Sequence, residues 1–295
     1  MTILQYVING LALGAVYALA AVGIALIFGV LRLVNFAYGE LITIGAYTLA
    51  LTSDWFLPFS LLACVAASVV LAVLTDRLAF KPLREASLAT TLVATFALSF
   101  ALEAVWRIVF GVEGRSADVL GALNTTAISG AVDIRWVTIV EVVVGLALLG
   151  GIAFFLQRST LGLQMRAAAH DIRTARTLGI KADRVILGAF VLSGILAAVV
   201  AMLLTAASPL VTPTLGLQIT TFALVGVVVG GMDNLVHATL GGFAVGFVNS
   251  VLGDALSADM RVFLPSFTFL AVILVLVLRP AGLFAPRGTR VVERV

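Results

Sequence analysis

The sequence predicts an all-α polytopic integral membrane protein: one bundle of about eight to ten helices that span the bilayer or re-enter it, with a further helix in the cytoplasm. Composition is the first reason, because 62% of the 295 residues are hydrophobic and 11% are charged, whereas soluble domains have about 45–50% and about 25%. Uncharged runs are the second: residues 4–31 carry no formal charge, and residues 185–232 are long enough for two crossings of about 20 residues each. The third is that Lys and Arg gather in clusters between these runs.

Nine apolar segments are expected to form the bundle, which we treat as a single transmembrane domain over residues 1–295. They are 4–31, 36–53, 55–76, 87–110, 136–156, 185–207, 217–232, 236–253 and 262–279. Three of them, 36–53, 217–232 and 236–253, are short and either cross the bilayer or re-enter it. Non-helical backbone at membrane depth is tolerated only where protein buries it or where it lines a cavity.

The cationic residues predict the orientation of these helices. Four cations flank the apolar segments at one end: Arg107, Arg115, Arg135 and Arg261. The others lie at the opposite end: Arg32, Arg77, Lys81, Arg84, Arg158, Arg166, Arg173, Arg176, Lys181, Arg184, Arg279, Arg287, Arg290 and Arg294. Because cytoplasmic loops carry the excess of Lys and Arg, we expect the N-terminus outside and the C-terminus in the cytoplasm. No Lys or Arg precedes the first apolar run, so we expect no cleavable signal peptide.

Few residues suit a metal site or a reactive thiol. The chain has one cysteine, Cys64, inside an apolar run, and two histidines, His170 and His237, which we assign to loops. Reactive thiols need a polar, electropositive setting, so we interpret Cys64 as a packing residue. We expect no metal site and no nucleic-acid partner, because in a membrane protein the cations set orientation.

Glycines at four-residue spacing predict close helix packing. Small residues at this interval let helix backbones approach one another in lipid. The candidates for such packing are Gly10, Gly14, Gly226, Gly230, Gly231, Gly241, Gly242 and Gly246.

The most charged stretch, within residues 157–184, is predicted to contain a helix over 161–179. Its alanines favour a helix, Ser159 or Thr160 suits the N-cap, and Gly179 suits the C-terminal stop. Two interpretations are open. The cations set orientation or touch anionic headgroups, or an amphipathic helix docks in a groove of a partner protein.

Four stretches resemble one transporter family. TLGLQMRAAAHDIRTARTLGIKADRV, at 160–185, resembles the coupling loop of permease subunits of ABC importers. NGLALGAVYALAAVGIALIFGVLRLVNFAYGELITIGAY at 9–47, GVVVGGMDNLVHATLGGFAVG at 226–246 and LRPAGLFAPRG at 278–288 are similar to the first helix, the glycine-rich hairpin and the C-terminal signature of the branched-chain amino acid (LivH-type) permeases. The match runs along essentially the whole chain in order. Tyr38 and the segment 232–237 depart from the family pattern.

The resemblance implies a transport subunit that is not an enzyme. Such a permease translocates Leu, Ile, Val or a similar small solute delivered by an extracytoplasmic binding protein, across a bacterial cytoplasmic (inner) membrane. It works with two ABC ATPases and with a second permease, either a relative or a copy of itself. ATP and Mg²⁺ bind the ATPases, and this chain, which has no G-x-x-x-x-G-K-[ST] motif, binds no cofactor. The residues expected to couple to the ATPase are Arg166, Ala167, His170, Asp171, Arg173, Arg176, Gly179 and Ile180.

Polar residues within apolar runs are candidates for the translocation path. Carboxylates are costly within a membrane and often functional, so Glu40 either faces the path or lies at the cytoplasmic interface paired with Arg32. Glu103 and Glu141 are interpreted as structural partners of nearby Arg107 and Arg135. The full set of path candidates is Asn35, Tyr38, Glu40, Thr43, Pro209, Thr212, Pro213, Thr214 and Gly216.

The stretch SPLVTPTLGLQITT at 208–221 interrupts an otherwise apolar run with two prolines and a glycine. It is either an external connection or a discontinuous helix whose N-terminus faces a substrate carboxylate.

An alternative function is an ion-coupled secondary transporter or channel, because such proteins combine buried carboxylates with broken helices. A membrane-embedded enzyme is disfavoured, since we find no convergent set of His, Asp, Ser or Cys.

Overall fold

The computed structural model describes residues 3–84, 86–128, 133–232, 234–279 and 283. Each of the nine apolar segments forms a helix, so the predicted all-α membrane fold is confirmed. The helices are α1 (Ile3–Leu31), α2 (Tyr38–Leu51), α3 (Leu57–Thr75), α5 (Leu88–Phe110), α6 (Trp136–Arg158), α9 (Ala182–Ala207), α10 (Leu215–Gly230), α11 (Leu235–Ala255) and α12 (Leu264–Leu278).

Short elements connect these helices. A π-helical segment (Asp76–Phe80) and α4 (Lys81–Leu83) continue α3; α7 (Thr160–His170) and α8 (Ile172–Thr177) follow α6; and 3-10 turns occupy Gly121–Asn124 and Ala258–Phe263. Two antiparallel pairs of strands complete the connections, β1 (Arg115–Ser116) with β4 (Leu210–Val211) and β2 (Thr126–Ile128) with β3 (Ile134–Arg135).

Helix length separates two classes within the bundle. Seven helical segments of the described chain are long and apolar enough to cross a membrane, and α11, expected to be short, is one of them. α2, with 14 residues, and α10, with 16, are below this length, whereas α12, with 15, reaches it together with the 3-10 turn Ala258–Phe263 that precedes it. At 1.5 Å per residue α2 and α10 are shorter than the hydrocarbon thickness of about 30 Å.

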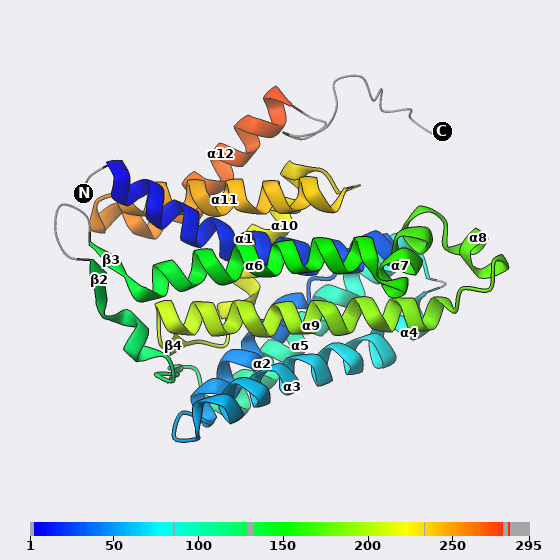
Figure 1. The fold of residues 1–295 in the computed structure, drawn as a ribbon, viewed down its shortest axis with the longest axis horizontal. Helices are drawn as coiled ribbons and strands as arrows, with labels where there is room; N and C mark the ends of the chain where they lie inside the picture. The colour runs from blue at the N-terminus through cyan, green and yellow to red at the C-terminus, as the bar shows by residue number, and fades with distance from the viewer. Residues whose placement is uncertain (1–2, 85, 129–132, 233, 280–282, 284–295) are drawn as a thin grey trace.

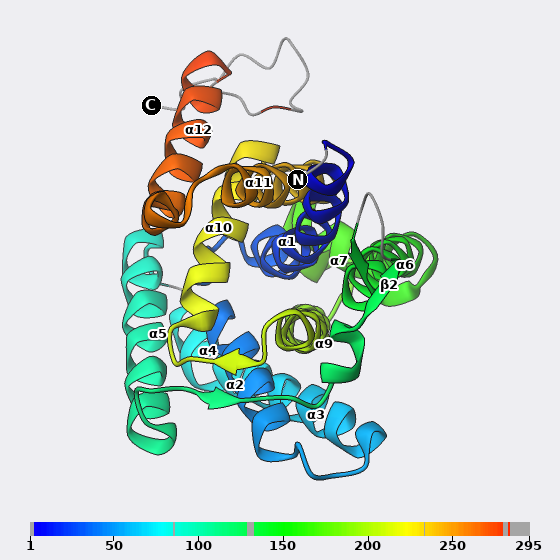
Figure 2. The same cartoon turned by 90° about the vertical axis from the view of Figure 1, so that its left-hand side faces the viewer.

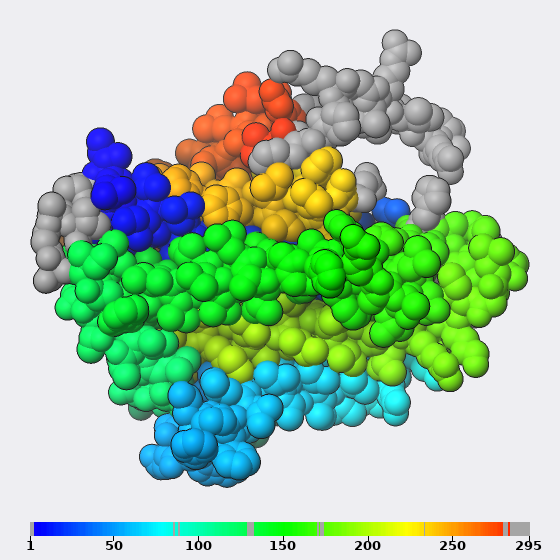
Figure 3. All heavy atoms as spheres, in the orientation of Figure 1, coloured from blue at the N-terminus to red at the C-terminus, as the bar shows by residue number. Residues whose placement is uncertain are grey.

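The bundle has two distinct ends (Figure 1). The basic end is the one at which α1 ends and α7 and α8 lie. The opposite end carries the start of α1 and the strands β2, β3 and β4, and β1 lies there too because it pairs with β4. Figure 3 shows α6 spread along one face, with α8 projecting at the basic end.

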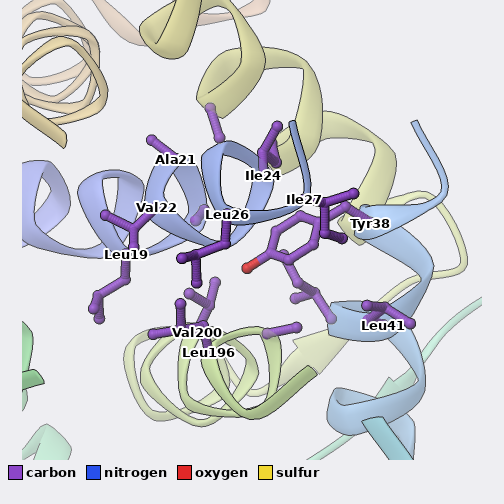
Figure 4. Close-up of a cluster of buried hydrophobic side chains, with 14 of the residues drawn as sticks. Leu19, Ala21, Val22, Ile24, Leu26, Ile27, Tyr38, Leu41, Leu196 and Val200 are labelled. Carbon is purple, nitrogen blue, oxygen red and sulfur yellow. The ribbon is translucent and has the colours of Figure 1, made fainter. Parts of the chain in front are cut away.

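The core lies around α1 and α9. Along the most apolar window of each helix, 83% of the residues of α1 and 61% of those of α9 are buried, but 22% or fewer in α3, α5, α6 and α12. The outer helices therefore expose apolar side chains, as expected for surfaces that face lipid. Figure 4 shows the centre of this core, where Leu19, Val22 and Leu26 of α1 meet Leu196 and Val200 of α9.

Glycines allow α11 to approach both α1 and α10. A Cβ at Gly246 would come within 2.9 Å of the Cα of Gly14, and one at Gly226 within 2.6 Å of the Cα of Gly242. In the same way, Gly10 faces Phe247 of α11. Gly230 and Gly241 lie at the contact between α10 and α11. Gly231 differs, because its φ of 111° ends α10.

The helices α1–α2–α3 and α9–α10–α11 form an inverted repeat. In each set a long helix is followed by a short one and another long one, and α1 and α9 run in opposite directions (Figure 1). The contacts obey the same relation: α1 packs on α11 as α9 packs on α3, and α10 packs on α1 as α2 packs on α9. The short helices share a sequence, Gly-x-x-Ile-Thr, at 39–43 and at 216–220. Inverted repeats of this kind are common in transporters.

Candidate functional site

The first candidate site is the crossing of the two short helices. Gly39 at the start of α2 and Gly216 at the start of α10 approach so closely that a Cβ on either would overlap the carbonyl group of the other. Thr43 connects the two helices, because its hydroxyl donates to the carbonyl oxygen of Gly39 (3.2 Å) and accepts from the backbone N–H of Gly216 (3.1 Å). Thr220, its counterpart in the repeat, is buried beside Gly39.

Several polar groups at this crossing are buried with no hydrogen-bond partner within the described chain. They are the Thr220 hydroxyl, the Tyr38 hydroxyl and the Asn35 side-chain amide nitrogen. The Oδ1 of Asn35 accepts from the backbone N–H of Ala37 at 3.0 Å, which fixes the turn into α2. The Tyr38 ring inserts beside α1, near Leu26 and Ile27 (Figure 4), and a Cβ on Gly23 would lie 2.6 Å from it. Unpaired buried groups are rare and are candidates for function.

Glu40 is satisfied by α5. Its two carboxylate oxygens accept hydrogen bonds from the Ser99 hydroxyl (3.0 Å) and from the Trp106 indole N–H (2.7 Å), and the residue is fully buried. The alternative in which Glu40 pairs with Arg32 is therefore wrong. The Arg32 guanidinium donates to the carbonyl oxygen of Ala169 at 3.0 Å instead, because α1 ends beside α7.

The other two buried glutamates behave differently from each other. Glu103 forms the expected ion pair with Arg107, one helical turn away. Within the described residues Glu141 forms no ion pair with Arg135, whose guanidinium donates to Asn124 Oδ1 at 3.3 Å. The direct contact expected for Glu141 is therefore absent, and Arg135 acts on this carboxylate only at longer range.

The remaining path candidates lie on the connection from α9 to α10, at the end opposite the basic end. There β4 pairs with β1, and the backbone N–H of Ala117 donates to the carbonyl oxygen of Pro209 at 2.7 Å. Pro213 is buried, Thr212 is half-buried and Thr214 is exposed. The hydroxyls of Thr212 and Thr214 are 3.4 Å apart. Pro209, Thr212 and Thr214 thus lie on this connection, ahead of the Gly216 that meets Gly39.

The second candidate site is the basic segment at 157–184, which forms two helices rather than one. The single helix expected over 161–179 breaks at Asp171, where the backbone is extended (φ −154°, ψ 108°). Asp171 Oδ2 accepts from the Thr174 hydroxyl at 2.5 Å, and its carbonyl accepts from the N–H of Ala175. Aspartate is a strong N-cap, so this residue starts α8 at the position where α7 ends.

The ends of this segment form as the sequence predicts. The Ser159 hydroxyl accepts from the backbone N–H of Gly162 at 2.9 Å and caps α7. Gly179 has a φ of 85°, and the N–H of Ile180 donates to the carbonyl of Ala175. This pattern is a Schellman-type stop, which favours glycine because other residues resist positive φ.

The segment exposes its cations and buries its alanines. Ala168 and Ala175 pack against the bundle, while Arg166 and Arg176 are exposed to solvent. Of the other expected coupling residues, Asp171 and Gly179 are exposed, Ala167 and Ile180 are half-buried, and the side chains of His170 and Arg173 lie outside the described part. Both histidines lie in helices, His170 in α7 and His237 in α11, not in the loops expected for them.

An ion-pair cluster joins the base of this segment to the bundle. The Arg84 guanidinium, which follows α4, pairs with Asp76 at 2.9 Å and with Asp183 of α9 at 2.5 Å. A hollow of about 700 Å³ lies beside it, lined by residues that include Arg32, Lys81 and Arg176. The described residues hold no group of three or more His, Cys, Asp or Glu side chains that would bind a metal.

Comparison with known proteins identifies the family. Residues 6–278 match the family described as "Branched-chain amino acid transport system / permease component". The chain belongs to this family of transport permeases. It is 31% identical to the high-affinity branched-chain amino acid transport system permease protein BraD of Pseudomonas aeruginosa, over 99% of this chain and 98% of BraD. It is 28% identical to the permease protein LivH of Salmonella typhimurium, over 99% of this chain and 97% of LivH.

Two solved structures share the fold of this permease. PsaBC from Streptococcus pneumoniae, in complex with Fab, matches with a TM-score of 0.53 and 17% identity, over 92% of this chain and 89% of that one. An inward-facing conformation of a putative metal-chelate type ABC transporter matches with a TM-score of 0.52 and 20% identity, over 93% of this chain and 84% of that chain. At these identities the likeness concerns the fold alone.

Proposed function

We propose that this chain is the membrane subunit of an ABC importer that takes up branched-chain amino acids. Family membership along 6–278 is the observation that carries the proposal. The relatives BraD and LivH are named as high-affinity branched-chain amino acid permeases. We therefore assign Leu, Ile and Val as substrates, delivered by an extracytoplasmic binding protein.

In this proposal the basic end faces the cytoplasm, and so does the C-terminus, while the N-terminus lies outside. The positive-inside rule supports this orientation. Two ATPase subunits bind ATP and Mg²⁺, and a second permease completes the membrane part. The chain itself holds no cofactor and catalyses no reaction.

The segment α7–α8 couples ATP hydrolysis to the bundle. It presents Arg166 and Arg176 to the ATPase, and its buried alanines transmit movement into α1 and α9. Two contacts support a rigid transmission: Arg32 holds α7 to α1, and Arg84 joins the start of α9 to the end of α3.

Reversing two exposed charges tests this coupling. The double variant Arg166→Glu/Arg176→Glu is expected to lose binding to the ATPase by about tenfold or more, because removing cross-interface charge pairs costs about 1.5 kcal/mol or more. The measurement is co-purification of ATPase with detergent-solubilised permease. Arg115→Glu, at the opposite end, is the matched control and should bind normally. Full binding by the double variant would reject the coupling role of α7–α8.

One feature favours the alternative of an ion-coupled transporter, namely the inverted repeat with two short helices that meet in the core. The energy source distinguishes the two functions. In vesicles with an intact proton gradient but no ATP, we expect uptake of leucine to stop. Uptake that continues without ATP and ends when the gradient is dissipated would establish the alternative.

A further inference from the structure

A groove opens beside α10, on the side of the bundle where α5 and α12 lie. Figure 2, which views the end that carries the N-terminus, shows α10 running from α2 toward α11 and α12. A hollow of about 270 Å³ lies between α10 and the first turns of α12. Its lining residues are Thr214, Leu217, Gln218, Thr221, Phe222, Pro265 and Phe269.

The α10 wall of this groove carries a polar row among apolar residues, and the α12 wall is apolar. Thr214, Gln218 and Thr221 follow one another at helical spacing on α10, so they share a face. Phe222 lies beside this row on α10, and its ring stacks on that of Phe269 of α12 with centroids 5.2 Å apart. The groove contains no charged residue among its lining side chains.

The polar wall lacks partners within the described chain. Gln218 is exposed and its side-chain amide makes no hydrogen bond there, and Thr214 makes only the 3.4 Å contact to Thr212. Thr221 donates to the carbonyl of Leu217, one turn back, which leaves its oxygen free to accept. An amide that faced lipid hydrocarbon would lose its hydrogen bonds to water without replacement. This face of α10 is therefore not built for lipid.

The inverted repeat provides an internal comparison. The residues of α2 that correspond to Thr214, Gln218 and Thr221 are Ala37, Leu41 and Ile44, all apolar. In the first repeat α5 covers α2, and the polar group on this side, Glu40, is paired with α5. In the second repeat α12 contacts α10 through Phe222 and Phe269, and within the described chain the polar row beside this contact has no hydrogen-bond partner on α12. The row is thus a feature of α10 alone and not a consequence of the repeat.

We infer that this groove binds the neutral amino acid during transport, an inference that rests on the proposed function. The amide of Gln218 and the hydroxyls of Thr214 and Thr221 offer both donors and acceptors to the ammonium and carboxylate groups. Leu217, Phe222 and Phe269 receive the aliphatic side chain. Uncharged polar groups suit a zwitterion, because they bind both of its charges without a net preference for anions or cations.

Cysteine labelling of the complete transporter tests the groove. In a Cys64→Ala background, Gln218→Cys should react with a charged, water-soluble thiosulfonate, because thiols react as thiolates in polar surroundings and not in lipid. Leucine-loaded binding protein, added at ten times its Kd for the transporter, should deliver leucine to the groove and so slow the labelling about tenfold. Leu146→Cys, at an exposed apolar position of α6, is the control and should stay unlabelled.

A second measurement follows uptake kinetics. Gln218→Leu is expected to raise the KM for leucine about tenfold, since hydrogen bonds to charged groups are strong, while Gln5→Leu, on α1 and outside the groove, leaves it unchanged. A thiol at 218 that does not react, or one that reacts but is not protected by leucine, would overturn the inference. Leucine uptake by the transporter with Gln218 intact separates the two proposals: its absence rejects the proposed function, whereas normal uptake with an unprotected thiol rejects the groove alone.

Discussion

Replacing Gly216 with alanine is expected to unfold or strongly destabilise the bundle. A Cβ at this position would overlap the backbone of Gly39 and crowd the Thr43 hydroxyl, which holds the N–H of Gly216. Overpacking in a well-packed core costs about 1–3 kcal/mol, and here the obstacle is backbone that has no other rotamer. We therefore expect a loss of about 3 kcal/mol in the free energy of unfolding, measured as thermal stability in detergent.

The control for this prediction is Gly150→Ala in α6. No atom lies within 4 Å of a Cβ at Gly150, which is exposed. Because alanine favours a helix by about 1 kcal/mol over glycine, this variant should be as stable as the original or more so. Because the two substitutions are chemically identical, opposite changes in the free energy of unfolding would be due to the close approach of α2 and α10. Equal effects at the two positions would contradict the crossing.

Replacing Glu40 with alanine should weaken the attachment of α5. This helix contacts the bundle through α2 and the π-helical segment Asp76–Phe80, and its most apolar window is 17% buried. The carboxylate accepts from Ser99 and Trp106, and its loss leaves both donors buried. A buried donor without a partner costs about 1–3 kcal/mol, although interhelical hydrogen bonds in membranes contribute only about 0.6 kcal/mol on average. We expect a loss of about 2 kcal/mol.

Thermal unfolding and proteolysis report on this change together. Glu40→Ala should lower the midpoint temperature of unfolding and speed proteolytic cleavage around α5. Glu40→Gln, which keeps one acceptor, should give values between those of Glu40→Ala and of the original protein. Glu113→Ala, in an exposed loop, is the matched control. If Glu40→Ala unfolds like Glu113→Ala, the hydrogen bonds to α5 do not hold that helix in place.

The repeat is the main feature that the sequence analysis missed. Its signal was present, because Gly-x-x-Ile-Thr occurs at 39–43 and again at 216–220. Five residues with two degenerate positions are too short to distinguish a repeat from chance in an apolar chain. The packing of α1 on α11 and of α9 on α3 provides the missing information.

Local patterns in the sequence determined most of the helices, their ends and several of their close contacts. Apolar runs gave all nine helices, Ser159 and Gly179 gave the limits of the basic segment, and the glycine pairs gave the close contacts of α11. Each of these depends on forces that act within a few residues, such as burial of apolar side chains, capping and the allowed φ of glycine. The break at Asp171 is a local signal too, because aspartate caps helices, but the alanines around it indicated one continuous helix.

Only the tertiary structure decided where the polar side chains point. Glu40 is five residues after Asn35 and eight after Arg32 in the chain, yet its partners are Ser99 and Trp106 on α5. Gly39 and Gly216 meet although α3, α5, α6 and α9 all lie between them in the chain. In an apolar chain almost every helix face satisfies the pattern for burial, so periodicity does not tell which faces meet protein and which meet lipid. Partner choice at these positions follows from hydrogen bonds and backbone fit between distant segments, and those exist only once the bundle is assembled.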